Sequence, residues 1–303
     1  MGMVRSNNEN YLTGFVLGFS DYLQLQKVLF VVISILYLLT IWGNTTIILV
    51  SHLEPKLQTP MYFFLSHLSF LDLCFTSSII PQLLVNLGSS DTSISDCVVQ
   101  LYISLALGST ECILLAMMSY DRYAAVCHPL HYAFLMSPQL CHILAPLAWL
   151  SRVATTLKQS TLILWLPFCS HHHVDHFLCE VSVLIKLACA DTTFNEAEFF
   201  VANILFLFMP VSLVLFSYGY IAKAVLRIKS ATGRKKAFGT CSSHLMVVII
   251  FMYLQPAKSR SKGQGKFVSL FYTVVTTILN SLIYTLRKKD IKGALQKVLG
   301  KML

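Results

Sequence analysis

Four polar side chains lie inside long apolar segments, where such groups are costly and therefore usually functional. Asp72 lies in LSFLDLCF and Glu111 in GSTECILL, and the amides of Asn44 and Asn280 lie at comparable depths in their own segments. Two carboxyl groups held close together either share a proton or hold a small cation. We therefore predict a polar knot of these four residues that could hold a cation. The alternative is that each side chain only satisfies a neighbouring hydroxyl.

A charged tripeptide, Asp121-Arg122-Tyr123, closes the apolar segment that begins near Cys97. About 25 residues separate Cys97 from Arg122, and as an α-helix they cover roughly 38 Å. This length crosses a hydrocarbon core of about 30 Å. The cysteine and the tripeptide are therefore predicted to lie on opposite sides of a membrane. Taken alone, the arginine could also be an ordinary anchor at a helix exit.

Composition indicates which elements hold these groups. The 303 residues are 55% hydrophobic and 12% charged, with a mean hydropathy of +0.67, whereas soluble domains carry about 25% charged residues. We predict an all-α integral membrane protein with a single domain over 1–303, and we expect no cleavable signal peptide. The predicted elements are seven spans and a basic amphipathic helix, at roughly 28–50, 61–87, 98–120, 140–166, 199–222, 237–255, 267–286 and 287–299.

The distribution of basic residues predicts the orientation. Seven spans place the two termini on opposite sides of the membrane. With the N-terminus outside, 14 Lys and Arg residues fall on the inner face and 7 on the outer face. Because inner loops carry the excess of basic residues, an extracellular N-terminus is favoured.

Four of the nine cysteines fall on the predicted outer side, where disulfides persist; they are Cys97, Cys169, Cys179 and Cys189. Four cysteines permit three pairings. A bond from Cys97 to the 168–197 loop would fasten that loop over the bundle. The other five lie in or near spans and are interpreted as reduced: Cys74, Cys112, Cys127, Cys141 and Cys241.

The loop segment 171–180 contains four histidines and Cys179, residue types that suit copper or zinc. We expect Cys179 to be used in a disulfide, so it would not supply a thiolate. A solvated, pH-sensitive loop is the preferred interpretation, and no metal site is predicted.

Several motifs together resemble those of the olfactory (odorant) receptors, a family of rhodopsin-like G-protein-coupled receptors. The similarity runs from about Phe19 to Leu299. The residues that carry it are PMYFFLSHLSFLD at 60–72, MMSYDRYAAVCHPLHY at 117–132, Ser217-Tyr218, KAFGTCSSH at 236–244 and NSLIY at 280–284.

The resemblance implies a multi-pass receptor of the plasma membrane, with neither enzymatic activity nor a cofactor. It implies a small-molecule odorant bound among the outer halves of spans three, five, six and seven, and a stimulatory heterotrimeric G protein at the inner face. Its disulfides would be Cys97–Cys179 and Cys169–Cys189, with Cys97–Cys189 as the alternative. Residues implied in coupling are Asp121, Arg122, Tyr123, Tyr218, His244, Asn280 and Tyr284.

Helical spacing supports a pocket in the region that the resemblance implies. The predicted lining is mostly apolar with a few hydroxyls, which suits a small volatile molecule. Plain helix packing is the alternative, because helix interfaces also use small residues. The predicted lining residues are Ser104, Leu105, Gly108, Ser109 and Cys112 on the third span, Ala202, Asn203 and Phe206 on the fifth, and Leu270, Thr273 and Thr277 on the seventh.

Four features depart from the family pattern. Asn280 is followed by Ser281 instead of proline, and the sixth span is about six residues short, or roughly 9 Å of helix. Arg152 and Lys158 lie in the fourth span, where each charge costs about 2.5–3.5 kcal/mol unless it is paired or snorkelling. The N-terminal tail has no glycosylation triplet. A member with impaired folding and signalling is therefore the alternative function.

A small-solute transporter is the runner-up from a different class. It would require paired half-chain repeats or a continuous polar path. Neither is evident in the sequence, and nothing in it indicates nucleic-acid binding. A receptor that responds to odorants within a lipid bilayer remains the leading prediction.

Overall fold

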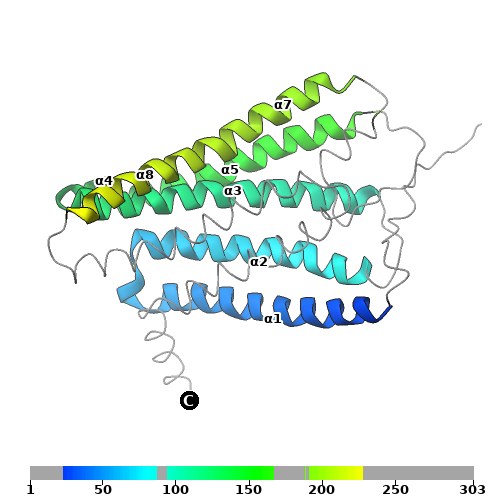
Figure 1. Cartoon of the computed structure of the whole chain (residues 1–303), viewed down its shortest axis with the longest axis horizontal. Helices are drawn as coiled ribbons and strands as arrows, with labels where there is room; N and C mark the ends of the chain where they lie inside the picture. The colour runs from blue at the N-terminus through cyan, green and yellow to red at the C-terminus, as the bar shows by residue number, and fades with distance from the viewer. Residues whose placement is uncertain (1–22, 87–93, 167–187, 189–190, 228–303) are drawn as a thin grey trace, which may run out of the picture.

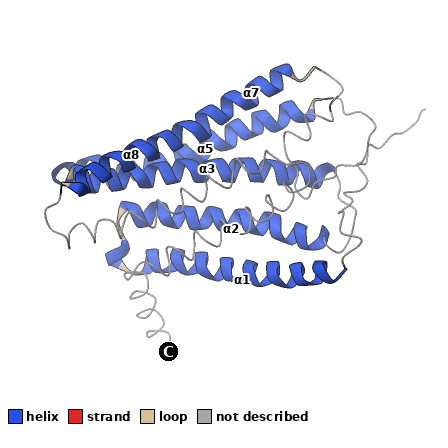
Figure 2. Ribbon diagram, viewed as in Figure 1, coloured by secondary structure: helices blue, strands red, loops and turns tan. Residues whose placement is uncertain are grey.

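The computed structural model describes residues 23–86, 94–166, 188 and 191–227, and nearly all of them are helical (Figures 1 and 2). The long helices are α1 (Leu23–Leu53), α2 (Pro60–Asn86), α3 (Ile94–Cys127), α5 (Pro138–Leu164), α7 (Thr193–Asn203) and α8 (Met209–Leu226). The short elements are η1 (Pro55–Leu57), η2 (Pro129–His131), α4 (Tyr132–Leu135) and the π-helical turn η3 (Ile204–Phe208), which joins α7 to α8.

Five stretches of the described residues are long and apolar enough to cross a membrane: Lys27–Leu53, Pro60–Pro81, Val99–Cys127, Pro138–Ile163 and Thr193–Leu226. Each overlaps one of the first five predicted spans. The predicted sixth and seventh spans and the amphipathic helix at 287–299 lie outside the described residues.

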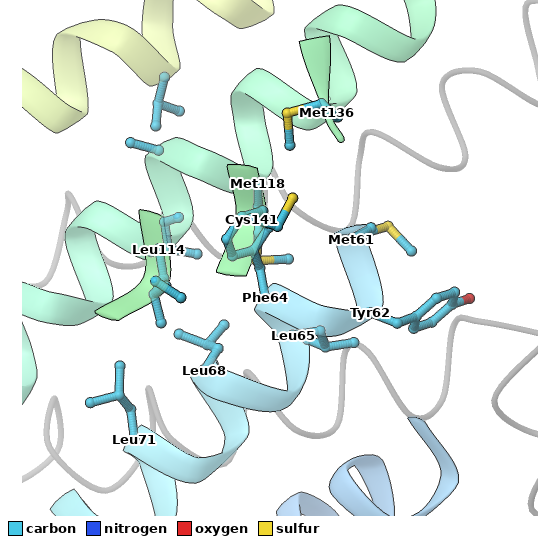
Figure 3. Packing of buried hydrophobic residues seen from close by; sticks show 14 of the residues in the cluster. Met61, Tyr62, Phe64, Leu65, Leu68, Leu71, Leu114, Met118, Met136 and Cys141 are labelled. Atoms are coloured by element: carbon cyan, nitrogen blue, oxygen red, sulfur yellow. The ribbon is translucent and has the colours of Figure 1, made fainter. Parts of the chain in front are cut away.

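α3 is the central helix of the described bundle. It packs against α2 on one side and against α5 and α8 on the other (Figure 1). Phe64 of α2, Met118 of α3 and Cys141 of α5 meet in a buried cluster (Figure 3). Large apolar side chains on the outer helices, such as Leu38 of α1 and Phe216 of α8, are exposed at the bundle surface. This pattern suits a helix bundle surrounded by lipid.

Local sequence explains where the helices begin and how they hold polar side chains. Ser137 caps α5, because its hydroxyl accepts a hydrogen bond from the amide of Leu140 at 3.3 Å and Pro138 fits the first turn. Within the helices, many hydroxyls donate to the carbonyl of the preceding turn, as Thr110 does to Ala106 at 2.7 Å. Such bonds let an apolar environment accommodate Ser and Thr.

Candidate functional site

The tripeptide predicted to couple to a partner lies in the last two turns of α3, which continues to Cys127. Asp121 is only 1% exposed. The phenol of Tyr132, in α4, donates a hydrogen bond to Oδ1 of Asp121 at 2.8 Å. Burial and this hydrogen bond raise the pKa of Tyr132, so the phenol keeps its proton at neutral pH. The bond fastens α4 to the end of α3.

Aromatic rings join α3 to α8 at the same end. The rings of Tyr123 and Tyr220 meet edge to face, with centroids 5.9 Å apart. The hydroxyl of Tyr123 lies 3.0 Å from Nε2 of His128. Tyr218 of α8 is buried in the main apolar cluster, and Arg122 is half-buried. The other predicted coupling residues, His244, Asn280 and Tyr284, lie outside the described residues.

Two large apolar side chains stand out from the connection between α3 and α5. Leu130 in η2 is 94% exposed and Phe134 in α4 is 84% exposed. Met136 is buried directly after α4. Together with the Tyr132–Asp121 hydrogen bond, it anchors a segment that presents Leu130 and Phe134 outward.

The predicted pocket residues of α3 lie in the N-terminal half and the middle of the helix. Cys112 is buried, while Ser104, Leu105 and Ser109 are half-buried. The hydroxyl of Ser109 donates to the carbonyl of Leu105. A methyl group added at Gly108 would meet no described heavy atom of another element within 4 Å. The described residues therefore leave open space beside this glycine, and the predicted pocket stays a prediction.

The predicted pocket residues of the fifth span lie where α7 passes into η3. Ala202 is buried, and the half-buried Phe206 is in the middle of the π-helical turn. Single π-helical turns are frequent at functional sites. Asn203 ends α7, but its side chain is outside the description, as are Leu270, Thr273 and Thr277.

The two charged residues of the fourth span have different environments. Lys158 is 62% exposed at its side chain and pairs with Glu198 of α7 at 3.2 Å. Arg152 is 3% exposed and points into the bundle, with its guanidinium carbon 3.8 Å from the centroid of the Phe206 ring. Both were predicted to be costly unless paired or snorkelling, and Lys158 is paired. The rotation of α5, which decides which of the two faces inward, could not be read from hydropathy.

The structure describes three of the four residues of the predicted polar knot. Asn44 and Asp72 are buried on the adjacent helices α1 and α2, and Glu111 is half-buried on α3. The amide nitrogen of Asn44 donates to the carbonyl of Thr40 at 3.1 Å, while its oxygen has no hydrogen-bond partner among the described residues. Asn280 lies outside them, so the knot stays a prediction.

Four cysteines within the described helices are free thiols: Cys74, Cys112, Cys127 and Cys141. This agrees with their interpretation as reduced. The side chain of Cys97 and the whole of Cys169, Cys179, Cys189 and Cys241 lie outside the description, so the disulfide pairings stay predictions.

Comparison with known sequences identifies the family. A sequence model of the family described as olfactory receptor matches residues 33–302. The chain belongs to the olfactory receptor family. It is 72% identical to Olfactory receptor 2G2 of Homo sapiens, over 100% of this chain and 98% of that protein. It is 59% identical to Olfactory receptor 2G6 of Homo sapiens, over 98% of this chain and 96% of the relative. Olfactory receptor 2C1 of Mus musculus is 55% identical, with 94% of each chain covered.

Membership makes this olfactory receptor a multi-pass membrane protein of the seven-helix, G-protein-coupled class, and not an enzyme. The resemblance drawn from the motifs is confirmed. Sequence reasoning missed the contacts that Tyr132, Tyr220 and Arg152 make. The family motif contains Tyr132, but its bond to Asp121 depends on the path of the loop between them.

Proposed function

We propose that this olfactory receptor binds a small volatile molecule beside the outer half of α3 and activates a stimulatory heterotrimeric G protein at its inner end. The receptor forms one seven-helix domain in the plasma membrane, with its N-terminus outside the cell. Odorant binding shifts the population of receptor states toward those that accept the G protein. The size of the shift is set by how much more tightly the odorant binds those states than the others.

One observation carries the proposed G-protein coupling: the anchored segment that exposes Leu130 and Phe134. An apolar pair 94% and 84% exposed, outside the membrane spans, is suited to a protein partner. The Tyr132–Asp121 bond couples the position of this pair to α3. A change in α3 at the odorant site would therefore reach the partner surface through one continuous helix.

The proposed odorant site is supported by the open space that the described residues leave at Gly108 and by Phe206, which lies in the π-helical turn. Half-buried Ser104, Leu105 and Ser109 provide the mixed apolar and hydroxyl lining that small ligands use. The neighbouring helix α5 borders this region, because its Arg152 contacts the ring of Phe206.

A cyclic-nucleotide reporter assay with a chemically diverse odorant panel tests the proposal. Cells expressing the full chain should respond to at least one odorant, and cells expressing an Arg122→Ala variant at equal surface density should not. Responses of equal size from both receptors would rule out coupling through the inner end of α3.

An impaired receptor is the second candidate, and an alignment difference favours it. The alignment with Olfactory receptor 2G2 runs over 312 positions although this chain has 303 residues, so the relative contains at least nine positions (312 less 303) without a counterpart here. The predicted shortening of the sixth span would account for about six of them. This candidate predicts poor surface delivery. Robust plasma-membrane expression, with an odorant response above that of Arg122→Ala, would refute it.

A further inference from the structure

Arg152 is a buried charge that the proposed function leaves without a role. Its side chain is 3% exposed, and neither Nε nor Nη1 has a hydrogen-bond partner among the described residues. Its guanidinium stacks on the ring of Phe206. A guanidinium remains protonated in proteins, and a buried positive charge with unused donors is costly. Among the described residues no carboxylate hydrogen-bonds to Nε or Nη1, so the site favours an added anionic group.

Two buried hydroxyls continue the same face of α5. Thr156 and Ser160 follow Arg152 by one and two helical turns, and neither oxygen has a hydrogen-bond partner within the described part of the chain. Other hydroxyls of α5 behave differently. Thr155 donates a hydrogen bond to the carbonyl of Ser151, and Thr161 donates one to the carbonyl of Leu157, both at 2.8 Å. Thr156 and Ser160 on the inward face of α5 thus have hydroxyl groups without a described hydrogen-bond partner, whereas Thr155 and Thr161 donate to carbonyls of their own helix.

On α3, across from this face, the described residues leave open space at Gly108. Cys112 is within electrostatic reach of Arg152, and Gly108, one turn away, has no described heavy atom of another element within 4 Å of an added methyl group. The helices α3 and α5 run in opposite directions (Figure 1). Thr156, which follows Arg152 in α5, and Gly108, which precedes Cys112 in α3, are therefore both displaced toward the same end of the bundle. The unused donors and the open space therefore lie on the same side of Arg152.

We infer that Arg152 makes this receptor selective for small carboxylic acids, with the carboxylate on the guanidinium, Thr156 as a second donor and the apolar tail beside Gly108. The inference rests on the proposed odorant-binding function and names the ligand class. The planar guanidinium matches a carboxylate with two parallel hydrogen bonds. A short alkanoic acid is volatile when neutral and ionised in neutral solution, because carboxyl groups titrate at a pH of about 4.

Direct binding to the purified full-length receptor in lipid nanodiscs tests the inference. The probes are octanoate, methyl octanoate and octanol at neutral pH, so that only the headgroup differs. The variants are Arg152→Met, Thr156→Val and the control Lys158→Met, which removes the same charge from the exposed face of α5.

Octanoate should bind the unmodified receptor more tightly than either neutral probe. Its affinity should fall at least about 30-fold in Arg152→Met, because truncating one member of a buried charge pair is costly. It should fall about fivefold in Thr156→Val and stay within about twofold in Lys158→Met. The affinity for methyl octanoate should not fall in Arg152→Met, which shows that this variant is folded.

Two results would overturn the inference and leave odorant binding intact: equal octanoate affinity in Arg152→Met and the unmodified receptor, or a preference of the unmodified receptor for methyl octanoate. Failure of octanoate, the neutral probes and a diverse odorant panel to bind the unmodified receptor would reject both this inference and the proposed odorant site.

Discussion

Replacing Tyr132 by Phe should destabilise the receptor measurably, because it removes one hydrogen bond and nothing else. The lost bond, 2.8 Å long, joins the phenol to a carboxyl group that is 1% exposed. Hydrogen bonds to charged groups contribute about 1.5–3 kcal/mol. The carboxyl of Asp121 would also lose a donor that water cannot easily replace. We therefore expect the free energy of unfolding to fall by about 1.5–3 kcal/mol.

The pH dependence of this loss has a definite sign. The pKa of Tyr132 is raised in the folded receptor, above its ordinary value of about 10. A raised pKa means that the stabilisation is fully present below the unfolded value and is lost as the pH rises through the folded value. The difference between the native receptor and Tyr132→Phe should thus be constant around neutral pH and shrink only in strong alkali.

Buried free thiols provide the assay. Cys112 and Cys141 are free and buried, so a thiol-reactive fluorophore reports their exposure on heating. Tyr120→Phe is the matched control, because Tyr120 is next to Asp121 in α3, is 40% exposed, and should change stability by no more than about 0.5 kcal/mol. If Tyr132→Phe unfolds at the same temperature as Tyr120→Phe, the bond does not fasten α4 to α3.

Three other substitutions test separate parts of the molecule. Arg152→Met should stabilise the ligand-free receptor by about 0.5–3 kcal/mol, because removing a mid-membrane charge recovers about 2.5–3.5 kcal/mol and loses a cation–π contact worth about 0.5–2 kcal/mol; a lower thermal midpoint would contradict this. Leu130→Asp should reduce odorant-stimulated reporter output at unchanged surface density; an unchanged response would remove Leu130 from the partner surface. Asp72→Asn should abolish any sodium-dependent rise in thermal stability; equal sodium dependence in both proteins would reject a cation at the polar knot.

The chain's long apolar segments could be predicted from sequence because hydropathy is a local property. The start of α5 is local as well, because the hydroxyl of Ser137 caps the helix and Pro138 fits its first turn. The apolar segment between Cys97 and Arg122 lies within α3, and the helix continues to Cys127. Periodicity also placed Gly108 and Cys112 on one face, beside space that the structure shows at Gly108.

Contacts between distant residues could not be predicted in the same way. Hydropathy treats Arg152 and Lys158 alike, although one meets the Phe206 ring and the other pairs with Glu198 near the bundle surface. Their separation depends on the rotation of α5 and on the π-helical turn that aims Phe206, and neither has a simple sequence signature. The Tyr132–Asp121 bond likewise depends on how η2 and α4 fold back on α3.

Topology labelling tests the central claim most directly: one helix bundle carries an odorant site facing out and a partner surface facing in. Leu130 and Asp191 are both exposed, at opposite ends of the described helices. We predict that a membrane-impermeant thiol reagent labels Asp191→Cys on intact cells, above the background of the native receptor, and labels Leu130→Cys only after permeabilisation. Labelling of both positions from the same compartment would contradict the account.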